Sequence, residues 1–150
     1  MIEAINFINE FDRIEKEDSY INKKKIDAFF DKYRNVVCNA DKLSNEYIRK
    51  KTLKIVNEGY KIIEKKNQKF INQKLRIYKK YFDNIFKGID DDIILDDEQR
   101  KAILTDEDYS LVIAGAGSGK TTTMAAKVKY LVDIKKVDPQ KIILLAFTNK

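Results

Sequence analysis

Three glycines alternate with small residues just before a lysine and three threonines, in the segment "AGAGSGKTTT". Glycine permits backbone angles at which successive N–H groups turn toward one anion. The pattern is that of a phosphate-binding loop, with alanine where the strictest form has glycine. The sequence therefore predicts a nucleoside triphosphate site made of Ala114, Gly115, Ala116, Gly117, Ser118, Gly119, Lys120 and Thr121.

Two side chains at the end of this loop would act as catalytic groups. Lys120 would reach the β- and γ-phosphates of ATP, and the Thr121 hydroxyl would hold Mg²⁺. A helix that begins here adds unpaired amides and the positive end of its dipole. The alternative is a glycine-rich turn without a ligand. The apolar run before the loop and the amphipathic pattern after it favour the phosphate site.

The elements around the loop predict the start of an α/β domain over residues 91–150. The run "LVIA" (111–114) is typical of a buried strand, residues 119–133 of a helix, and "KIILLAF" (141–147) of a second, parallel strand. The predicted fold class is α/β: a helical N-terminal region and then a parallel-sheet P-loop NTPase (RecA-like) domain. Because two parallel strands are not stable alone, we expect the chain to be part of a longer protein.

Residues 1–90 are predicted to form a helical hairpin or a short bundle. Apolar residues recur every three or four positions over most of the stretch from Ile2 to Ile85, without a proline, and Gly88 marks the end. Gly59 is the weak point of this pattern, because glycine inside a helix costs about 1 kcal/mol relative to alanine.

The net charge of +6 is unevenly distributed. Residues 49–80 include 12 basic and 2 acidic side chains, whereas residues 83–98 include seven acidic side chains and one lysine. The basic stretch could follow the phosphates of DNA. Its lysines could equally be the solvated face of an amphipathic helix, and we favour this second interpretation because the whole sequence is rich in lysine.

Composition argues against several classes of protein. The absence of histidine excludes histidine-based acid–base catalysis and, with a single cysteine, disfavours a zinc site. Cys38 alone forms no internal disulfide, which fits a reducing cytoplasm. No apolar run approaches the roughly 20 residues that cross a bilayer, and the N-terminus is not a secretory signal. We expect a cytoplasmic protein without membrane contact.

Three segments resemble the UvrD/Rep-like helicases of superfamily 1. They are "LDDEQRKAI" (95–103), similar to a glutamine motif, "AGAGSGKTTTM" (114–124), similar to the family's phosphate loop, and "ILLAFTNK" (143–150), similar to its first DNA-track motif. Residues 67–90 are similar to the helical lead-in of helicase-IV-type members. The resemblance implies an ATP-dependent DNA helicase that translocates 3′ to 5′ on single-stranded DNA, separates duplex and serves processes such as DNA repair.

The resemblance also implies roles for individual side chains near the nucleotide. Gln99 would read the adenine edge, although Asp96 and Gln99 also have the spacing of a capping box. Lys127 aligns with a basic residue that many relatives use near the nucleotide, and it could equally be a solvated helix lysine. Thr122 stands where several relatives carry arginine, which leaves a nucleotide contact from this position open.

The last motif implies contacts with single-stranded or partly duplex DNA. Phe147 would stack on a base, unless it ends a buried strand, and Thr148 and Asn149 would touch phosphate. The acidic pair and the arginines that such a motor needs for hydrolysis are not found in the sequence, so we expect the chain alone to lack DNA-stimulated ATPase activity.

Other interpretations keep part of this assignment. The motor could belong to a nuclease–helicase or a phage-defence protein. Residues 1–90 could be an interaction module for a protein partner. A small-molecule kinase is disfavoured, because the glutamine motif and "FTNK" together have no role there.

Overall fold

The computed structural model of the protein describes residues 1–115 and 117–145. Contacts divide the chain into two compact units, called unit 1 (residues 1–72 with 106–109) and unit 2 (residues 73–105 with 110–150). The sequence predicted two domains, residues 1–90 and 91–150, and this boundary stays a prediction.

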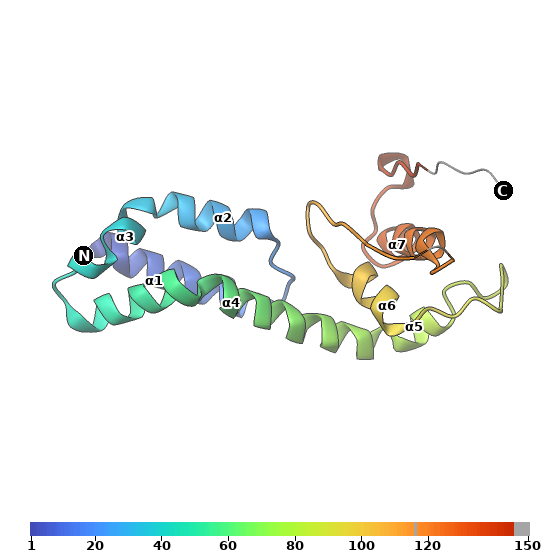
Figure 1. Ribbon diagram of the computed structural model, residues 1–150, viewed down its shortest axis with the longest axis horizontal. Coiled ribbons are helices and arrows are strands. Elements are labelled where there is room, and N and C mark those ends of the chain that lie inside the picture. Colours follow the sequence, from blue (N-terminus) through green and yellow to red (C-terminus); the bar gives the residue numbers. More distant parts are fainter. Residues whose placement is uncertain (116, 146–150) are drawn as a thin grey trace. The chain divides into compact units, whose positions relative to one another are not determined.

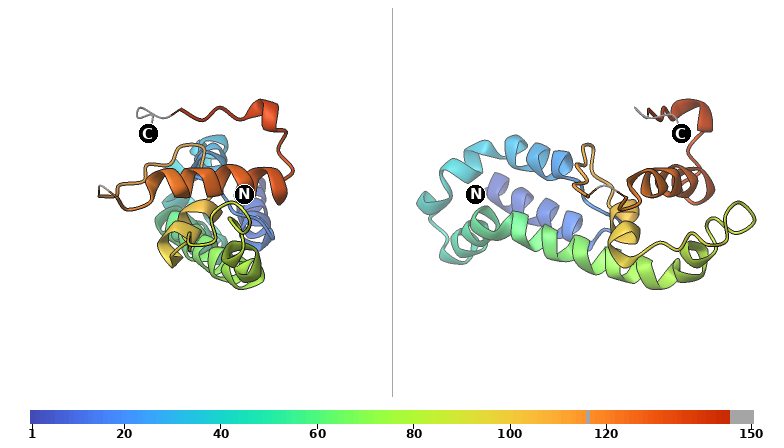
Figure 2. Two further views of the ribbon diagram at one scale, coloured as in Figure 1. Left: turned by 90° about the vertical axis from the view of Figure 1, so that its right-hand side faces the viewer. Right: turned by 45° about the vertical axis from the view of Figure 1, so that its right-hand side comes forward.

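Unit 1 is built from helices whose apolar faces meet in one core. Figures 1 and 2 show α1, α2 and the first part of α4 side by side, with α2 running opposite to the other two. The core is rich in aromatic rings; Phe7, for example, stacks on Phe29 with ring centroids 5.0 Å apart. The elements are α1 (Ile2–Lys16), α2 (Lys23–Lys32), α3 (Arg34–Cys38), the 3-10 helix η1 (Ala40–Lys42) and α4 (Glu46–Ile77), which continues into unit 2.

Gly59 lies where α4 meets two aromatic rings, so the glycine has a packing role that the sequence did not indicate. A Cβ atom at this position would lie 2.7 Å from Phe30 Cζ and 3.3 Å from Phe11 Cε2. The Phe30 ring also stacks on Tyr60, with centroids 5.0 Å apart. The absence of a side chain lets these rings approach the helix, which offsets the low helix propensity of glycine.

Asn67 of α4 holds the linker between α1 and α2. Its Oδ1 accepts a hydrogen bond from the backbone N–H of Ile21 at 2.9 Å, and its Nδ2 donates to the Ile21 carbonyl at 2.7 Å. Both residues are buried. One amide side chain thus satisfies both polar backbone groups of a buried linker residue, as a strand neighbour would.

The segment 106–109 packs on the start of α2 within unit 1. The Glu107 carboxylate accepts hydrogen bonds from the Tyr20 hydroxyl and from the backbone N–H of Lys23, both at 2.8 Å. Burial and this carboxylate raise the pKa of the Tyr20 hydroxyl. The Lys23 amide is one of the N–H groups that α2 leaves unpaired at its N-terminus, so Glu107 acts as a second cap beside Asn22.

Thr52 is fully buried in α4, and its hydroxyl has no hydrogen-bond partner in the part of the chain that the structure describes. A buried polar group without a partner costs about 1–3 kcal/mol. We therefore expect Thr52→Val, which keeps the shape and removes the hydroxyl, to raise the free energy of unfolding by about 1 kcal/mol. Urea denaturation followed by circular dichroism measures this change.

Thr105→Val is the matched control for this substitution, because the Thr105 hydroxyl donates to the Lys101 carbonyl at 2.9 Å. This variant should not gain stability. A Thr52→Val variant that is less stable than the original chain would show that the hydroxyl has a partner in solution.

Unit 2 places two helices against each other, as Figures 1 and 2 show for α6 and α7. Tyr130 of α7 stacks on Phe82, and the Tyr81 hydroxyl donates to Asp133 at 3.1 Å. Asp83 pairs with Arg100 at 2.9 Å; hydrogen bonds from Lys79 and Arg100 lower the pKa of Asp83. Besides the end of α4, the elements are α5 (Lys79–Asp83), α6 (Asp97–Leu104), α7 (Lys120–Asp133) and the 3-10 helix η2 (Pro139–Lys141).

The predicted α/β fold class is wrong for this structure, which is helical. Residues 1–115 and 117–145 contain no strand and no sheet, although the sequence predicted strands at 111–114 and 141–147. Among the large apolar side chains in the described parts of the two segments, Ile142 is half-buried and the other six are between 50% and 88% exposed. A strand exists only when a neighbour accepts its backbone hydrogen bonds, and the described part of these segments has no such neighbour. Apolar, β-branched composition alone was therefore a misleading signal.

None of the helices within the described ranges has the length and apolar character that crossing a lipid bilayer requires.

Candidate nucleotide-binding site

The glycine-rich loop leads directly into α7. Gly119, the residue before the first helical turn, has φ +77°, and Gly117 has φ +74°. A side chain would strain both positions, because this left-handed region is open mainly to glycine. The first turn of α7 has no side-chain cap. Its N–H groups, which have no partner inside the helix, are thus available for an anion. Ala116 lies outside the described residues.

Lys120 lies over the loop from which it emerges. Its Nζ donates to the carbonyl of Ala114 at 3.0 Å and to that of Gly115 at 2.6 Å, and the Ser118 hydroxyl donates to the same Gly115 carbonyl at 2.7 Å. Lys120 is exposed. An exposed ammonium held only by loop carbonyls can turn to a phosphate at the cost of two solvent-accessible hydrogen bonds, which contribute little each.

The threonines after Lys120 differ in accessibility. Thr121 is exposed, Thr122 is half-buried, and Thr123 is buried with its hydroxyl donating to the Gly119 carbonyl at 3.0 Å. Thr121 is thus the threonine whose hydroxyl is open to a metal. No group of three or more acidic, cysteine or histidine side chains suited to a metal occurs among the described residues. This donor set fits Mg²⁺ that arrives with a nucleotide, because Mg²⁺ is commonly held by few protein ligands, water and phosphate oxygens.

Gln99 of α6 takes part in the capping box and also contacts the phosphate loop. Its Oε1 accepts from the backbone N–H of Asp96 at 3.0 Å while Asp96 accepts from the Gln99 N–H at 2.8 Å, so the capping box is present. Its Nε2 also donates to the Ser118 carbonyl at 3.3 Å. A Cβ atom at Gly119 would lie 2.7 Å from this Nε2. The glutamine therefore already touches the phosphate loop, while its contact with adenine stays a prediction.

Lys127 joins the two helices of the site. Its Nζ donates to the carbonyls of Ile103 at 2.6 Å and Thr105 at 2.7 Å, at the C-terminal end of α6. A lysine there satisfies carbonyls that have no partner within the helix. Lys127 is half-buried, so it is not the freely solvated lysine that was one alternative. Its contact with a nucleotide stays a prediction.

The three residues predicted to contact DNA, Phe147, Thr148 and Asn149, lie outside the described residues. The contact between Tyr81 and Asp133, which ties α5 to α7, was missed at the sequence level. These residues are 52 positions apart, and no periodic pattern connects them.

Residues 95–150 match the family model described as the UvrD/REP helicase N-terminal domain. This segment is a UvrD/Rep-like helicase N-terminal portion. The match includes α6, the phosphate loop and α7, so the resemblance seen in the three motifs is confirmed. The likeness of residues 67–90 to helicase-IV-type proteins lies outside the matched range and stays a prediction.

Curated relatives of the UvrD/Rep-like segment are described as DNA helicases. A "Probable DNA helicase II homolog" of Mycoplasma capricolum is 42% identical over 57 residues, which are 38% of this chain and 8% of the relative. An "ATP-dependent DNA helicase PcrA" of Staphylococcus epidermidis is 45% identical over 56 residues, 37% of this chain and 8% of the relative. A "Probable DNA helicase" of Mycoplasma pneumoniae is 45% identical over 56 residues, 37% of this chain and 11% of the relative. The chain thus matches about a tenth of the length of these relatives. No solved structure gives a significant match.

Proposed function

We propose that the chain supplies the ATP-binding part of a DNA helicase. In this proposal the protein couples ATP hydrolysis to 3′ to 5′ movement along single-stranded DNA and separates the duplex ahead. The observation that carries the proposal is the loop at the start of α7, where an exposed lysine and an uncapped helix N-terminus lie together. One relative is described as an ATP-dependent DNA helicase, which supports ATP as the nucleotide.

Different residues of the loop would bind different parts of the nucleotide. The amides at the start of α7 and Lys120 would hold the phosphates, and Thr121 would hold Mg²⁺, which neutralises the charge that develops during phosphoryl transfer. Gln99 would select adenine by turning its amide from the Ser118 carbonyl to the base. The three residues Phe147, Thr148 and Asn149 would contact the DNA strand.

The adenine role of Gln99 predicts a preference for ATP over GTP of about tenfold, the equivalent of one hydrogen bond. Gln99→Glu should abolish this preference. A glutamate keeps the acceptor that the capping box needs and removes the Nε2 donor, so α6 stays capped. Titration of the chain with fluorescent ATP and GTP analogues in the presence of Mg²⁺ measures both affinities.

Glu98→Gln, on the same turn of α6, is the matched control and should leave the preference unchanged. Glu98 is exposed and, among the described residues, forms its ion pair with Lys101 on its own helix. Equal affinities for ATP and GTP in the original chain would refute the adenine role.

The helicase activity itself is tested on protein expressed from its natural gene. ATP should drive strand separation of a duplex with a 3′ single-stranded tail and not of one with a 5′ tail. Activity only on the 5′ tail would reverse the proposed direction, and activity on neither would refute the function. A cytoplasmic location and a protein partner for residues 1–90 are secondary parts of the proposal.

A further inference from the structure

One face of α4 carries a row of lysines directed away from the core of unit 1. Buried positions recur at every fourth residue along this part of the helix: Gly59, Ile63, Asn67 and Ile71. Lys61, Lys65 and Lys69 each lie two residues from the buried positions on either side, which is about 200° around the helix. All three are exposed, as is Lys54 two turns earlier on the same side. These four lysines are called the lysine ridge.

The ridge differs from three other lysines of the basic stretch 49–80, which have partners within the protein. Lys66 turns inward, where its Nζ donates to the Ser19 carbonyl and burial lowers its pKa. Lys51 pairs with Asp12 of α1 at 2.8 Å, and Lys79 pairs with Asp83 at 2.6 Å. Each of these three lysines thus already has a partner within the protein. The sequence alone did not separate them from the lysines of the ridge.

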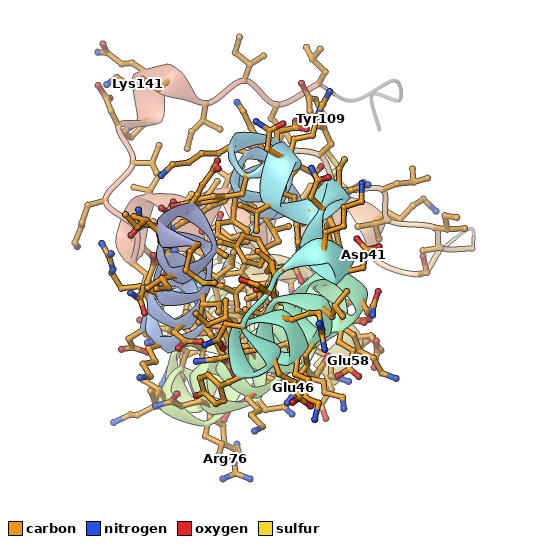
Figure 3. The ribbon with its side chains drawn as sticks, turned by 90° about the vertical axis from the view of Figure 1, so that its left-hand side faces the viewer. Asp41, Glu46, Glu58, Arg76, Tyr109 and Lys141 are labelled. Carbon is orange, nitrogen blue, oxygen red and sulfur yellow. The ribbon has the colours of Figure 1, made fainter. Side chains whose placement is uncertain are left out.

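No hydrogen bond or ion pair joins a ridge lysine to any residue within the described ranges. The acidic residues nearest in sequence, Glu58 and Glu64, are exposed and pair with none of them. Figure 3 shows Glu46 and Glu58 at the outer surface of α4. Like charges four residues apart destabilise a helix by a few tenths of a kcal/mol per pair. Two such pairs, Lys61 with Lys65 and Lys65 with Lys69, lie in the ridge, and no ion pair within the described ranges neutralises these three lysines.

We propose that the lysine ridge binds the phosphate backbone of a nucleic acid. From Lys54 to Lys69 the ridge extends about 22 Å, which matches about six nucleotides of one B-form strand at 3.4 Å each. A linear polyanion complements the charge of all four lysines along the helix, and lysines serve this role without reading sequence. The choice of a nucleic acid over an acidic protein rests on the proposed helicase function. The ridge is a second contact surface, separate from the loop that would bind ATP.

Replacement of all four ridge lysines by glutamine should reduce the salt dependence of nucleic-acid binding. Each lost phosphate contact lowers the slope of log K against log salt by about 0.7 for a single strand, so the slope should fall by nearly 3. The measurement is fluorescence anisotropy of a labelled 12-nucleotide thymidine strand with the chain between 50 and 300 mM KCl. Affinity at the lowest salt should fall at least tenfold.

The control removes the same charge from elsewhere on unit 1, at the exposed residues Lys16, Lys23, Lys24 and Lys42. Its slope should change by less than 1. The proposal would be overturned if the two variants lose equal affinity for the DNA strand, or if the salt slope of the ridge variant is unchanged. Tighter ridge-dependent binding of polyglutamate than of the DNA strand would overturn the choice of partner.

The ridge variant should keep its affinity for ATP and its helical circular dichroism. A chain that binds DNA through the ridge yet binds no nucleotide would refute the ATP-binding part of the proposed function alone. If the chain binds ATP but the ridge variant has the same salt slope of DNA binding as the original chain, only the ridge proposal is refuted.

Discussion

Replacing Lys120 with alanine should weaken the affinity of the chain for ATP by about 10- to 100-fold. Hydrogen bonds between charged groups contribute about 1.5–3 kcal/mol each, and Lys120 is the residue placed to make one with the terminal phosphates. Among the described residues, its Nζ donates to two loop carbonyls, at 2.6 and 3.0 Å. The substitution should therefore change binding and leave the helical content unchanged.

Titration with a fluorescent ATP analogue and Mg²⁺ measures the effect of Lys120→Ala. Lys129→Ala is the matched control: Lys129 lies on the same helix and pairs with Asp133 at 3.1 Å. This control should bind ATP within about twofold of the original chain, because the pair lies at the surface, contributes at most about 1 kcal/mol, and is about two and a half helical turns from Lys120. Undiminished affinity in Lys120→Ala would remove the basis for a phosphate site at the start of α7.

Asn67→Ala should lower the free energy of unfolding by about 2–4 kcal/mol. The substitution removes two hydrogen bonds, of 2.9 and 2.7 Å, and leaves both polar backbone groups of Ile21 buried without a partner. Each buried unsatisfied group costs about 1–3 kcal/mol. Urea denaturation, followed by the helical signal in circular dichroism, gives the difference in stability.

Asn57→Ala controls for the change in helix propensity, because Asn57 lies exposed on the same helix. It should change the free energy of unfolding by no more than about 0.5 kcal/mol. If Asn67→Ala is as stable as this control, the linker between α1 and α2 does not depend on the Asn67 side chain.

Local patterns in the sequence predicted the helical character of residues 2–86 and the starts of α6 and α7. Apolar spacing indicated the helices of residues 2–86, and the capping box at Asp96 and Gln99 marked the start of α6 where the structure has it. The glycine–lysine–threonine pattern predicted a helix from residue 119, and α7 begins at Lys120. These features depend on hydrogen bonds and side-chain contacts between residues a few positions apart, which is why the sequence shows them directly.

Contacts between distant segments were not predictable in this way. Asn67 and Ile21 are 46 positions apart, and Glu107 and Tyr20 are 87 apart. Gly59 looked unfavourable from its helix propensity, yet the rings of Phe30 and Phe11 occupy the space that its missing side chain leaves. The strands predicted around residues 111 and 143 failed for the same reason, because a strand requires a partner that local composition does not supply.

By itself, the sequence determined where α6 and α7 begin, that residues 2–86 are mainly helical, and which family the segment 95–150 resembles. All of these depend on residue types at short, regular spacing. Only the tertiary structure decided that Gln99 contacts the phosphate loop, that Lys127 caps α6, and which lysines of α4 are structural. These outcomes depend on packing, since a polar side chain satisfies whichever backbone group the fold brings within hydrogen-bonding distance.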